Sequence, residues 1–321
     1  MPLNILILGA GATGGYFGGR LAQAAEQGKT NINVRFLVRE PRAQALHADG
    51  LVLQTPQETR RLRVNAVLHT ELKPEYDLVL LSCKAYDLET AIFAIYPAMR
   101  PDTYVLPLLN GIQHFDRLDA EFGARRVLGG CCHLEGTLTD AGVVRQMSAL
   151  HRITYGLRPG NDTAAQAVLD ALHTAYQQTP VNARFSKQVL LEIWEKFVFL
   201  ATLAGMTTLM RAAIGDIVAA DEGVAQISKM LDECDAAASY AGYAPRHEVL
   251  EGSRKILTQP ASTFTSSMLR DLEAGRRTEA AHIVGDMLHR ARAAGQKANM
   301  LALAWTHLQA RDARRNREST G

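Results

Sequence analysis

The chain has 321 residues, enough for two domains and a large core, and its composition is ordinary for a globular protein. Its formal net charge of +2 gives no general case for nucleic acid, and no apolar run is long enough to predict a membrane span. The four cysteines show no CxxC or metal-ligand spacing, so no metal site is predicted. Since no signal peptide is visible, we expect a cytoplasmic protein with buried thiols.

The first residues predict a turn that binds a dinucleotide. An apolar strand over residues 5–8 runs into Gly9, Gly11 and Gly14, and a helix is expected over residues 14–27. In this spacing the first glycine permits a tight turn, the second lets a pyrophosphate approach the backbone, and the third lets the helix pack on the strand. A glycine-rich turn in another α/β fold is the alternative, but the order of strand, glycines and helix favours the motif. The residues predicted to hold the cofactor phosphates are Gly9, Gly11, Ala12, Thr13 and Gly14.

The rest of the first half alternates strands and helices. This order predicts an α/β domain of the Rossmann type, with a doubly wound parallel sheet. The expected strands cover residues 34–38, 51–53, 62–67, 77–82, 104–109 and 127–130, and a helix is expected over residues 88–99.

After about residue 180, extended segments end and helical periodicity takes over, which predicts an all-α C-terminal domain. We place the two domains at residues 1–184 and 185–321. A helix over residues 188–213 is apolar nearly all round and should be buried. A helical second domain often supplies a dimer face, so a homodimer through it is one expectation. Further helices are expected over residues 221–241, 266–274, 279–294 and 300–311.

Polar residues follow several predicted strands, where ligands bind in a doubly wound sheet. Arg39 ends the second strand, Lys84 follows the strand over 77–82, and Asn110 follows the strand over 104–109. NAD-binding proteins usually have an acidic residue at the place of Arg39, whereas a guanidinium suits a 2′-phosphate. We therefore expect NADP(H), although Glu40 could serve as the acidic residue that NAD(H) needs.

One lysine in the second half could act as an acid. Reducing a ketone leaves an alkoxide, which needs a proton donor close by. Lys196 lies in a strongly apolar stretch, and burial lowers the pKa of a lysine. An ion pair with Glu192 on an exposed helix face explains the same spacing, and the residues alone do not decide between the two.

A second polar cluster lies between residues 265 and 279. If the segment is one helix, Ser267, Asp271 and Glu279 share one face. Gly275 could instead break it and leave Thr278 as the cap of a new helix. Ordinary capping with surface charge is the alternative to a functional cluster.

Together these segments resemble the ketopantoate reductase (2-dehydropantoate 2-reductase) family over nearly the whole chain. The glycine motif is generic, but the order of the motifs is specific. They are GAGATGG at residues 9–15, CKAY at 83–86, LNG at 109–111, WEK at 194–196 and SSML at 266–269, followed by Asp271, Thr278 and Glu279.

The resemblance implies NADPH-dependent reduction of ketopantoate to pantoate, on the route to pantothenate and coenzyme A. It implies that Lys196 is the general acid and that Glu279 helps to bind substrate and to place the lysine. It also implies that Asn110 serves cofactor and substrate and that Ser267 lies near the substrate carboxylate. Lys84 would line the cofactor side, and Arg39 would contact the 2′-phosphate.

The chain departs from the family pattern at two positions. Family members carry asparagines four and eight residues after the catalytic lysine, where this chain has Leu200 and Ala204. These substrate-facing positions are now apolar, which favours a 2-keto acid or ketone with a less polar body than ketopantoate. A related dehydrogenase acting on a 3-hydroxy acid or polyol phosphate would share the glycine motif and the helical second domain, but Ser267, Asp271 and Glu279 favour the reductase. Leu200 and Ala204 also leave open a non-catalytic NADP(H)-binding sensor, against which Lys196 and Glu279 argue.

Overall fold

The computed structural model describes residues 1–319, which form two compact units. The first unit is Met1–Leu109 with His114–Val189, and the second is Asn110–Gln113 with Leu190–Gly321. The chain thus changes unit at Val189, a few residues after the predicted boundary at 184. The short segment Asn110–Gln113 belongs with the helical second unit, which the sequence did not indicate.

A parallel sheet forms the centre of the first unit and confirms the predicted doubly wound architecture. Its strands are β1 (Leu3–Leu8), β2 (Ile32–Leu37), β5 (Asn65–Val67), β6 (Leu78–Leu81) and β7 (Tyr104–Pro107). They run in the order β5-β2-β1-β6-β7, and each neighbouring pair is parallel. The strand order reverses beside β1, so the carboxyl ends of β1, β2 and β6 meet where such sheets bind dinucleotides.

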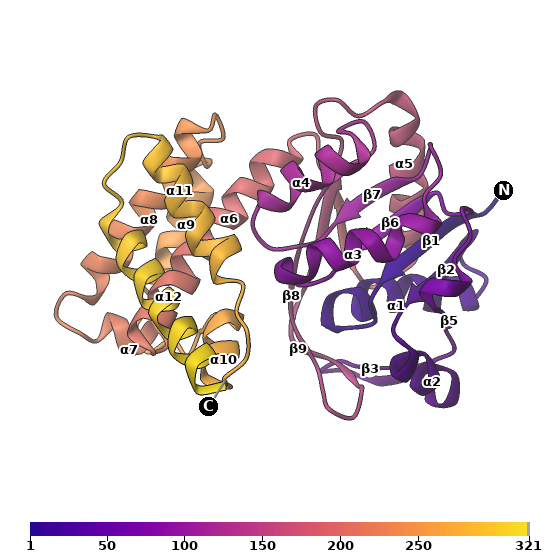
Figure 1. Cartoon of the computed structure of the whole chain (residues 1–321), viewed down its shortest axis with the longest axis horizontal. Helices are drawn as coiled ribbons and strands as arrows, with labels where there is room; N and C mark the ends of the chain where they lie inside the picture. The colour runs from indigo at the N-terminus through magenta and orange to yellow at the C-terminus, as the bar shows by residue number, and fades with distance from the viewer. Residues whose placement is uncertain (320–321) are drawn as a thin grey trace. The chain divides into compact units, whose positions relative to one another are not determined.

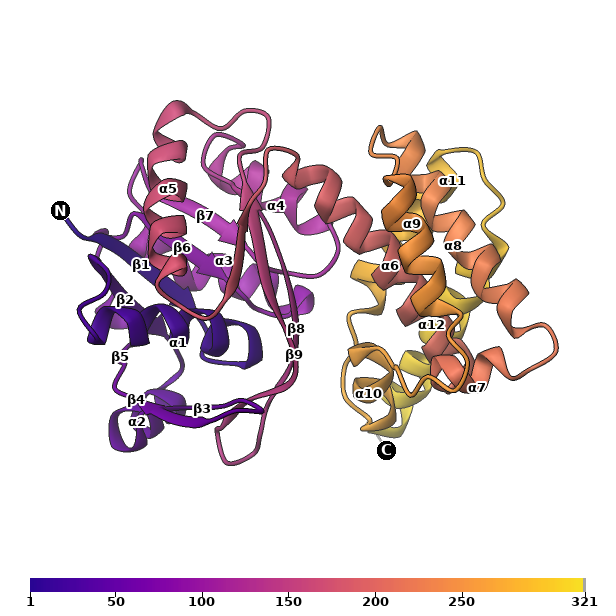
Figure 2. The ribbon, with the colours of Figure 1, turned by 180° about the vertical axis from the view of Figure 1, so that it is seen from behind.

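Helices cover both faces of this sheet. They are α1 (Ala12–Glu26), α2 (Glu40–Asp49), α3 (Leu88–Ile95), α4 (Gln113–Phe122) and α5 (Thr163–Gln177), with short 3₁₀ turns η1 (His69–Glu71), η2 (Ala85–Asp87) and η3 (Tyr96–Ala98). Figure 1 shows α3 and α4 in front of the sheet, and Figure 2, seen from behind, shows α1 and α5 on the other face. The helix predicted over residues 88–99 is too long, since α3 ends at Ile95 and Pro97 lies in η3.

A second, mixed sheet in this unit was not predicted. It consists of β3 (Leu51–Gln54), β4 (Thr59–Leu62), β8 (Gly129–Leu138), β9 (Val144–Gly156) and β10 (Asn182–Phe185). β9 pairs antiparallel with β8 and parallel with β3 and β10. The strand predicted over 127–130 is divided between the two sheets, since Val127 forms a parallel bridge with Val105 of β7 whereas Gly129 begins β8. β10 lies beyond residue 180, where we expected only helices.

The single strand predicted over residues 62–67 is also wrong. Leu62 pairs with Leu51 in the mixed sheet, whereas Asn65 pairs with Arg35 in the parallel sheet. The chain therefore crosses from one sheet to the other within three residues, and the apolar pattern hides the break.

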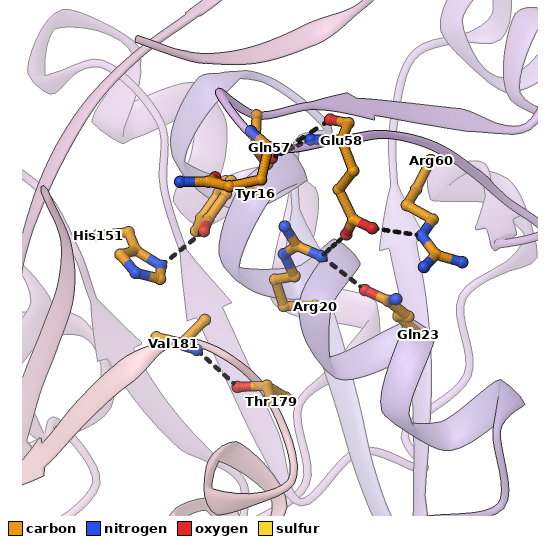
Figure 3. A network of polar contacts seen from close by, with 10 residues as sticks. Tyr16, Arg20, Gln23, Gln57, Glu58, Arg60, His151, Thr179 and Val181 are labelled. Atoms are coloured by element: carbon orange, nitrogen blue, oxygen red, sulfur yellow. Dashed lines mark hydrogen bonds and ion pairs between the residues drawn. The ribbon is translucent and has the colours of Figure 1, made fainter. Parts of the chain in front are cut away.

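A polar network attaches α1 to the mixed sheet (Figure 3). The Tyr16 hydroxyl lies 2.7 Å from Nδ1 of His151 on β9, and the Arg20 guanidinium lies 3.2 Å from the Glu58 carboxylate in the β3–β4 turn. Arg20 also donates to the side-chain oxygen of Gln23 at 2.8 Å. Because α1 follows the glycine turn directly, these contacts fix the position of that turn.

The second unit is helical, as predicted. Its helices are α6 (Val189–Met210), α7 (Ile214–Val218), α8 (Gly223–Tyr240), α9 (His247–Leu257), α10 (Ser267–Glu273), the π-helix η4 (Ala281–Gly285), α11 (Asp286–Ala293) and α12 (Asn299–Ser319). α6 packs tightly on α8, since a Cβ at Gly205 would lie 2.6 Å from the sulfur of Met230. The short α7 and α9 were not predicted, and α12 extends well past the predicted end at 311. No helix within residues 1–319 is long and apolar enough to span a membrane.

Candidate active site

The glycine turn has the geometry that its sequence predicts. Gly9 has a positive φ of 87° and follows β1 directly. A Cβ at Gly14 would lie 2.5 Å from the carbonyl oxygen of Gly9 and would also clash with the Ser82 hydroxyl. A Cβ at Gly11, by contrast, would meet nothing within 4 Å. Gly14 is therefore needed for packing, whereas Gly11 leaves open space beside the backbone.

A cavity of about 670 Å³ opens beside this turn, at the carboxyl ends of β1, β2 and β6. Gly9, Gly11, Arg39 and Arg42 are among the residues that line it. The predicted Ala12 and Thr13 begin α1, next to these glycines. Lys84 is not among the described residues that line the cavity. It is half-buried and lies two residues after Ser82, which does line the cavity.

Two guanidinium groups lie at the strand-two end of the cavity. Arg39 is exposed and precedes α2, whose first turn begins at Glu40. Arg42 is half-buried and donates from Nη2 to the carbonyl oxygen of Ala10 at 3.2 Å, and burial lowers its pKa. Its buried Nε has no hydrogen-bond partner among the described residues. The donors here suit an anionic group, and Arg42 is a residue that the sequence analysis did not assign to the cofactor.

In the second unit, the predicted acid Lys196 meets the predicted Asn110. The ammonium donates to the side-chain oxygen of Asn110 at 3.0 Å. Lys196 is half-buried on α6. It therefore does not lie on the fully exposed helix face that the alternative, an ion pair with Glu192, assumed. The neighbouring Glu195 is buried and bound by the Arg246 guanidinium, with its Nε at 2.7 Å and Nη2 at 2.5 Å. This clamp fixes the turn of α6 that carries the lysine.

The two apolar positions on the lysine face differ in exposure. Leu200 is half-buried, whereas Ala204 is completely buried. The hydroxyl of Thr208 donates to the backbone oxygen of Ala204 at 2.6 Å. Of the two, Leu200 is the one that the structure leaves accessible to a small molecule.

The segment after residue 265 is broken, not one helix. Gly275 has a positive φ of 71° just after α10 ends. Ser267 and Asp271 therefore lie on α10 and Glu279 lies beyond the break, so the three do not share the face of one helix. Ser267 is exposed at the start of α10, while Ser266 caps that helix by accepting from the Leu269 amide at 3.0 Å.

The expected cap at Thr278 is wrong. Its buried hydroxyl has no hydrogen-bond partner among the described residues. The backbone oxygen of Glu279 accepts from the amide of His282 at 3.1 Å and begins the next helix. The Glu279 side chain is itself buried, with 7% exposed.

No group of three or more His, Cys, Asp or Glu side chains within residues 1–319 is arranged to hold a metal ion.

Comparisons with known proteins identify the family of the chain. The family model described as "Ketopantoate reductase PanE/ApbA" matches residues 5–160, and its C-terminal counterpart matches residues 188–312. The chain is 31% identical over 307 residues to the "Uncharacterized oxidoreductase YkpB" of Bacillus subtilis strain 168, covering 96% of this chain and 98% of that protein.

Solved structures show the same fold. The crystal structure of 2-dehydropantoate 2-reductase from Geobacter metallireducens GS-15 aligns with a TM-score of 0.83 and 25% identity, over 96% of this chain and 99% of that one. A ternary structure of D-mandelate dehydrogenase with NADH and anilino(oxo)acetate aligns with a TM-score of 0.83 and 22% identity, over 98% and 100%. The chain therefore belongs to the ketopantoate reductase family and is an oxidoreductase.

Proposed function

We propose that this oxidoreductase reduces a 2-keto acid to the 2-hydroxy acid with NADPH, with 2-dehydropantoate as the first candidate substrate. The observation that carries the proposal is the half-buried Lys196 ammonium, held 3.0 Å from Asn110. When bound, NADPH supplies the hydride that reduces the C2 carbonyl. The lysine supplies the proton to the carbonyl oxygen.

Lys196 is suited to that role by its donors. An ammonium has three N–H groups, so it can donate to Asn110 and to a substrate oxygen together. Its positive charge also stabilises the alkoxide that forms on that oxygen. The buried Glu279 is proposed to orient substrate and lysine, and the exposed Ser267 is proposed to contact the substrate carboxylate. Residues 185–321, together with Asn110, would then form the catalytic domain.

The donors around the cavity beside the glycine turn fit NADP(H). The open space at Gly11 would accept a pyrophosphate, with the first turn of α1, including Ala12 and Thr13, donating to it. We propose that Arg39 binds the 2′-phosphate, since a guanidinium matches a phosphate with two parallel hydrogen bonds. Lys84 is proposed to contribute positive charge on the same side. Glu40 favours NAD(H) instead, although Gln44 already donates to its carboxylate at 2.9 Å.

Leu200 favours a second candidate substrate within the same reaction. A leucine where family members carry asparagine removes a hydrogen bond that a polar substrate would use, which costs about 1 kcal/mol. We therefore propose a 2-keto acid with a less polar body as the alternative to ketopantoate. The D-mandelate dehydrogenase structure, with a similar fold, holds a ligand with an anilino group. Because the chain is an oxidoreductase of this family, we propose neither a non-catalytic sensor nor a polyol-phosphate dehydrogenase.

The test is an activity assay on a panel of keto acids, with NADPH and with NADH in turn. The loss of absorbance of the reduced cofactor measures turnover. Ketopantoate, its unbranched analogues and phenylglyoxylate would cover the polar and apolar candidates. Turnover of at least one keto acid with NADPH is expected. If ketopantoate gave much the highest kcat/KM, the less polar substrate would be ruled out.

A homodimer through the helical unit is also proposed. Large apolar side chains are exposed on three of its helices: Tyr240 on α8 (68%), Ile256 on α9 (46%) and Leu303 on α12 (55%). Light scattering after size exclusion should give twice the mass of the chain. Replacing Tyr240 and Leu303 by Asp should reduce that mass if these helices form the interface.

A further inference from the structure

His282 lies at an unusual place in the second unit. It is the second residue of the π-helix η4, and only 8% of it is exposed. A π-helix widens the backbone for about one turn, and such turns are frequent at functional sites. No motif in the sequence marked this histidine.

His282 interlocks with the turn that carries Asn110. Its ring hydrogen-bonds the backbone of Asn110. The next residue, Gly111, has a positive φ of 79°, and a Cβ there would lie 2.9 Å from Cδ2 of the His282 ring and 2.9 Å from the His282 carbonyl oxygen. Only glycine permits both the backbone conformation and this approach. The ring therefore holds the Asn110 backbone from one side.

The side chain of Asn110 in turn holds the Lys196 ammonium at 3.0 Å. A hydrogen bond weakens steeply when its geometry changes, so a shift of the Asn110 backbone would loosen the lysine. His282, Asn110 and Lys196 thus form one chain of contacts within the second unit.

Charged groups surround the ring. Asp286 and Glu279 favour its protonated form, whereas Arg290 and burial disfavour it, and burial, the largest effect, lowers the pKa of His282. Arg290 bonds to the Asp286 carboxylate at 2.8 Å and lies over the Trp194 ring at 5.5 Å. Arg290 therefore links Asp286 to Trp194, which lies two residues before Lys196 on α6. These contacts hold the helix that follows His282 against α6.

We propose that His282 is a positioning residue for the reaction: it fixes the Asn110 backbone so that the Asn110 side chain holds the Lys196 ammonium. The mechanistic part of this proposal rests on the proposed role of Lys196 as the acid.

The test compares His282→Phe, which keeps a ring without its N–H donor, with His282→Gln, which keeps a donor. Asn110→Ala and the double variant H282F/N110A complete a double-mutant cycle. His307→Phe, on α12 of the same unit, is the matched control. Thermal melting checks that each variant folds, and His282→Gln decides the question if His282→Phe does not fold.

The first readout needs no activity. An amine-reactive ester labels the cofactor-free protein, and mass spectrometry follows the acylation rate of Lys196 against Lys229 and Lys255. We expect H282F and N110A to change the Lys196 rate severalfold in the same direction, H282Q to restore it in part, and the double variant to match N110A. An unchanged Lys196 rate in a folded H282F, or effects of H282F and N110A that simply add, would overturn the proposal. If H282F does not fold, an H282Q variant that changes the Lys196 rate as much as N110A does would overturn it, because the retained donor should hold Asn110.

The second readout is steady-state reduction of ketopantoate, or of the best keto acid in the panel. H282F should lower kcat by about 10- to 100-fold with little change in KM, because misplaced catalytic groups cost rate more than binding. A normal kcat beside an altered acylation rate would overturn the mechanistic part. If the wild-type protein reduces no keto acid, the proposed function fails, yet the acylation rates still decide whether His282 holds Asn110 and Lys196 in place.

Discussion

The Lys196 ammonium donates to the side-chain oxygen of Asn110, 86 residues earlier in the chain. The sequence indicated these two residues separately, one in an apolar helix and the other at the end of a strand. Asn110–Gln113 and the part of α6 that carries Lys196 belong to the same compact unit. A group expected to serve cofactor and substrate is thus bound to the group expected to supply the proton.

The glycine turn predicts different effects for two similar substitutions. Gly14→Ala should destabilise the protein by about 1–3 kcal/mol, because its Cβ would press on the Gly9 carbonyl. Gly11→Ala should leave the melting temperature nearly unchanged, since its Cβ would meet nothing within 4 Å, yet it should weaken NADPH binding. Thermal melting and fluorescence titration measure the two effects. Equal melting temperatures for both variants would show that Gly14 does not pack as described.

Arg39 should determine the preference for NADPH. Replacing Arg39 by Ala removes charge-assisted hydrogen bonds to a 2′-phosphate and should raise the Kd for NADPH by roughly 10- to 100-fold, with little effect on NADH. Glu40→Gln is the matched control, because Glu40 is the neighbouring carboxylate. A loss of NADH affinity in Glu40→Gln, with no change in Arg39→Ala, would instead identify an NAD(H) enzyme.

Leu200 should influence the choice of substrate. Leu200→Asn restores the amide that family members carry and should shift kcat/KM towards ketopantoate, relative to an apolar keto acid, by about fivefold, which corresponds to about 1 kcal/mol. Leu200→Ala removes the same apolar surface without adding an amide. Should both variants shift the ratio alike, the effect comes from space and not from a hydrogen bond.

Two histidines predict loss of stability in acid. Burial lowers the pKa of His282 and, together with Arg20, that of His151 below the ordinary value of 6.5. Below about pH 6.5 the unfolded chain binds more protons at these histidines than the folded chain does. Their contribution to the free energy of unfolding is therefore fully present above about pH 6.5 and is lost as the pH falls from there through their lower folded-state pKa values. Chemical unfolding between about pH 5 and about pH 7.5 measures this slope. His151→Gln should make the slope shallower; an unchanged slope would mean that this ring does not contribute.

The parallel sheet and the glycine turn could be predicted because their signals are local. The strand of residues 5–8, the glycines and the helix follow one another directly in the sequence, and each of the three glycines has a definite role in the motif. The break at Gly275 was one of two alternatives that the sequence left open, and the positive φ of this glycine after α10 decides for it.

The mixed sheet could not be predicted as one sheet, because the pairing that joins its two hairpins, β3–β4 and β8–β9, is between segments distant in the chain. Leu53 of β3 pairs with Val144 of β9, and neither segment alternates strongly enough to mark its partner. The same holds for the site. The place of Arg42 beside the cavity and the proposed role of His282 depend on contacts with Ala10 and Asn110 that no spacing in the sequence indicates. Thr278 had the residue type of a cap, but the backbone of Glu279 begins the helix instead.

The most direct test of the account is the turnover number of Lys196→Ala with NADPH and the best keto acid, measured beside its affinity for NADPH. Loss of a general acid should lower kcat by about 10²- to 10⁴-fold, while the Kd for NADPH stays within about threefold of the wild-type value. A variant that keeps near-normal kcat would contradict the assignment of Lys196 as the proton donor, and with it the mechanism proposed here.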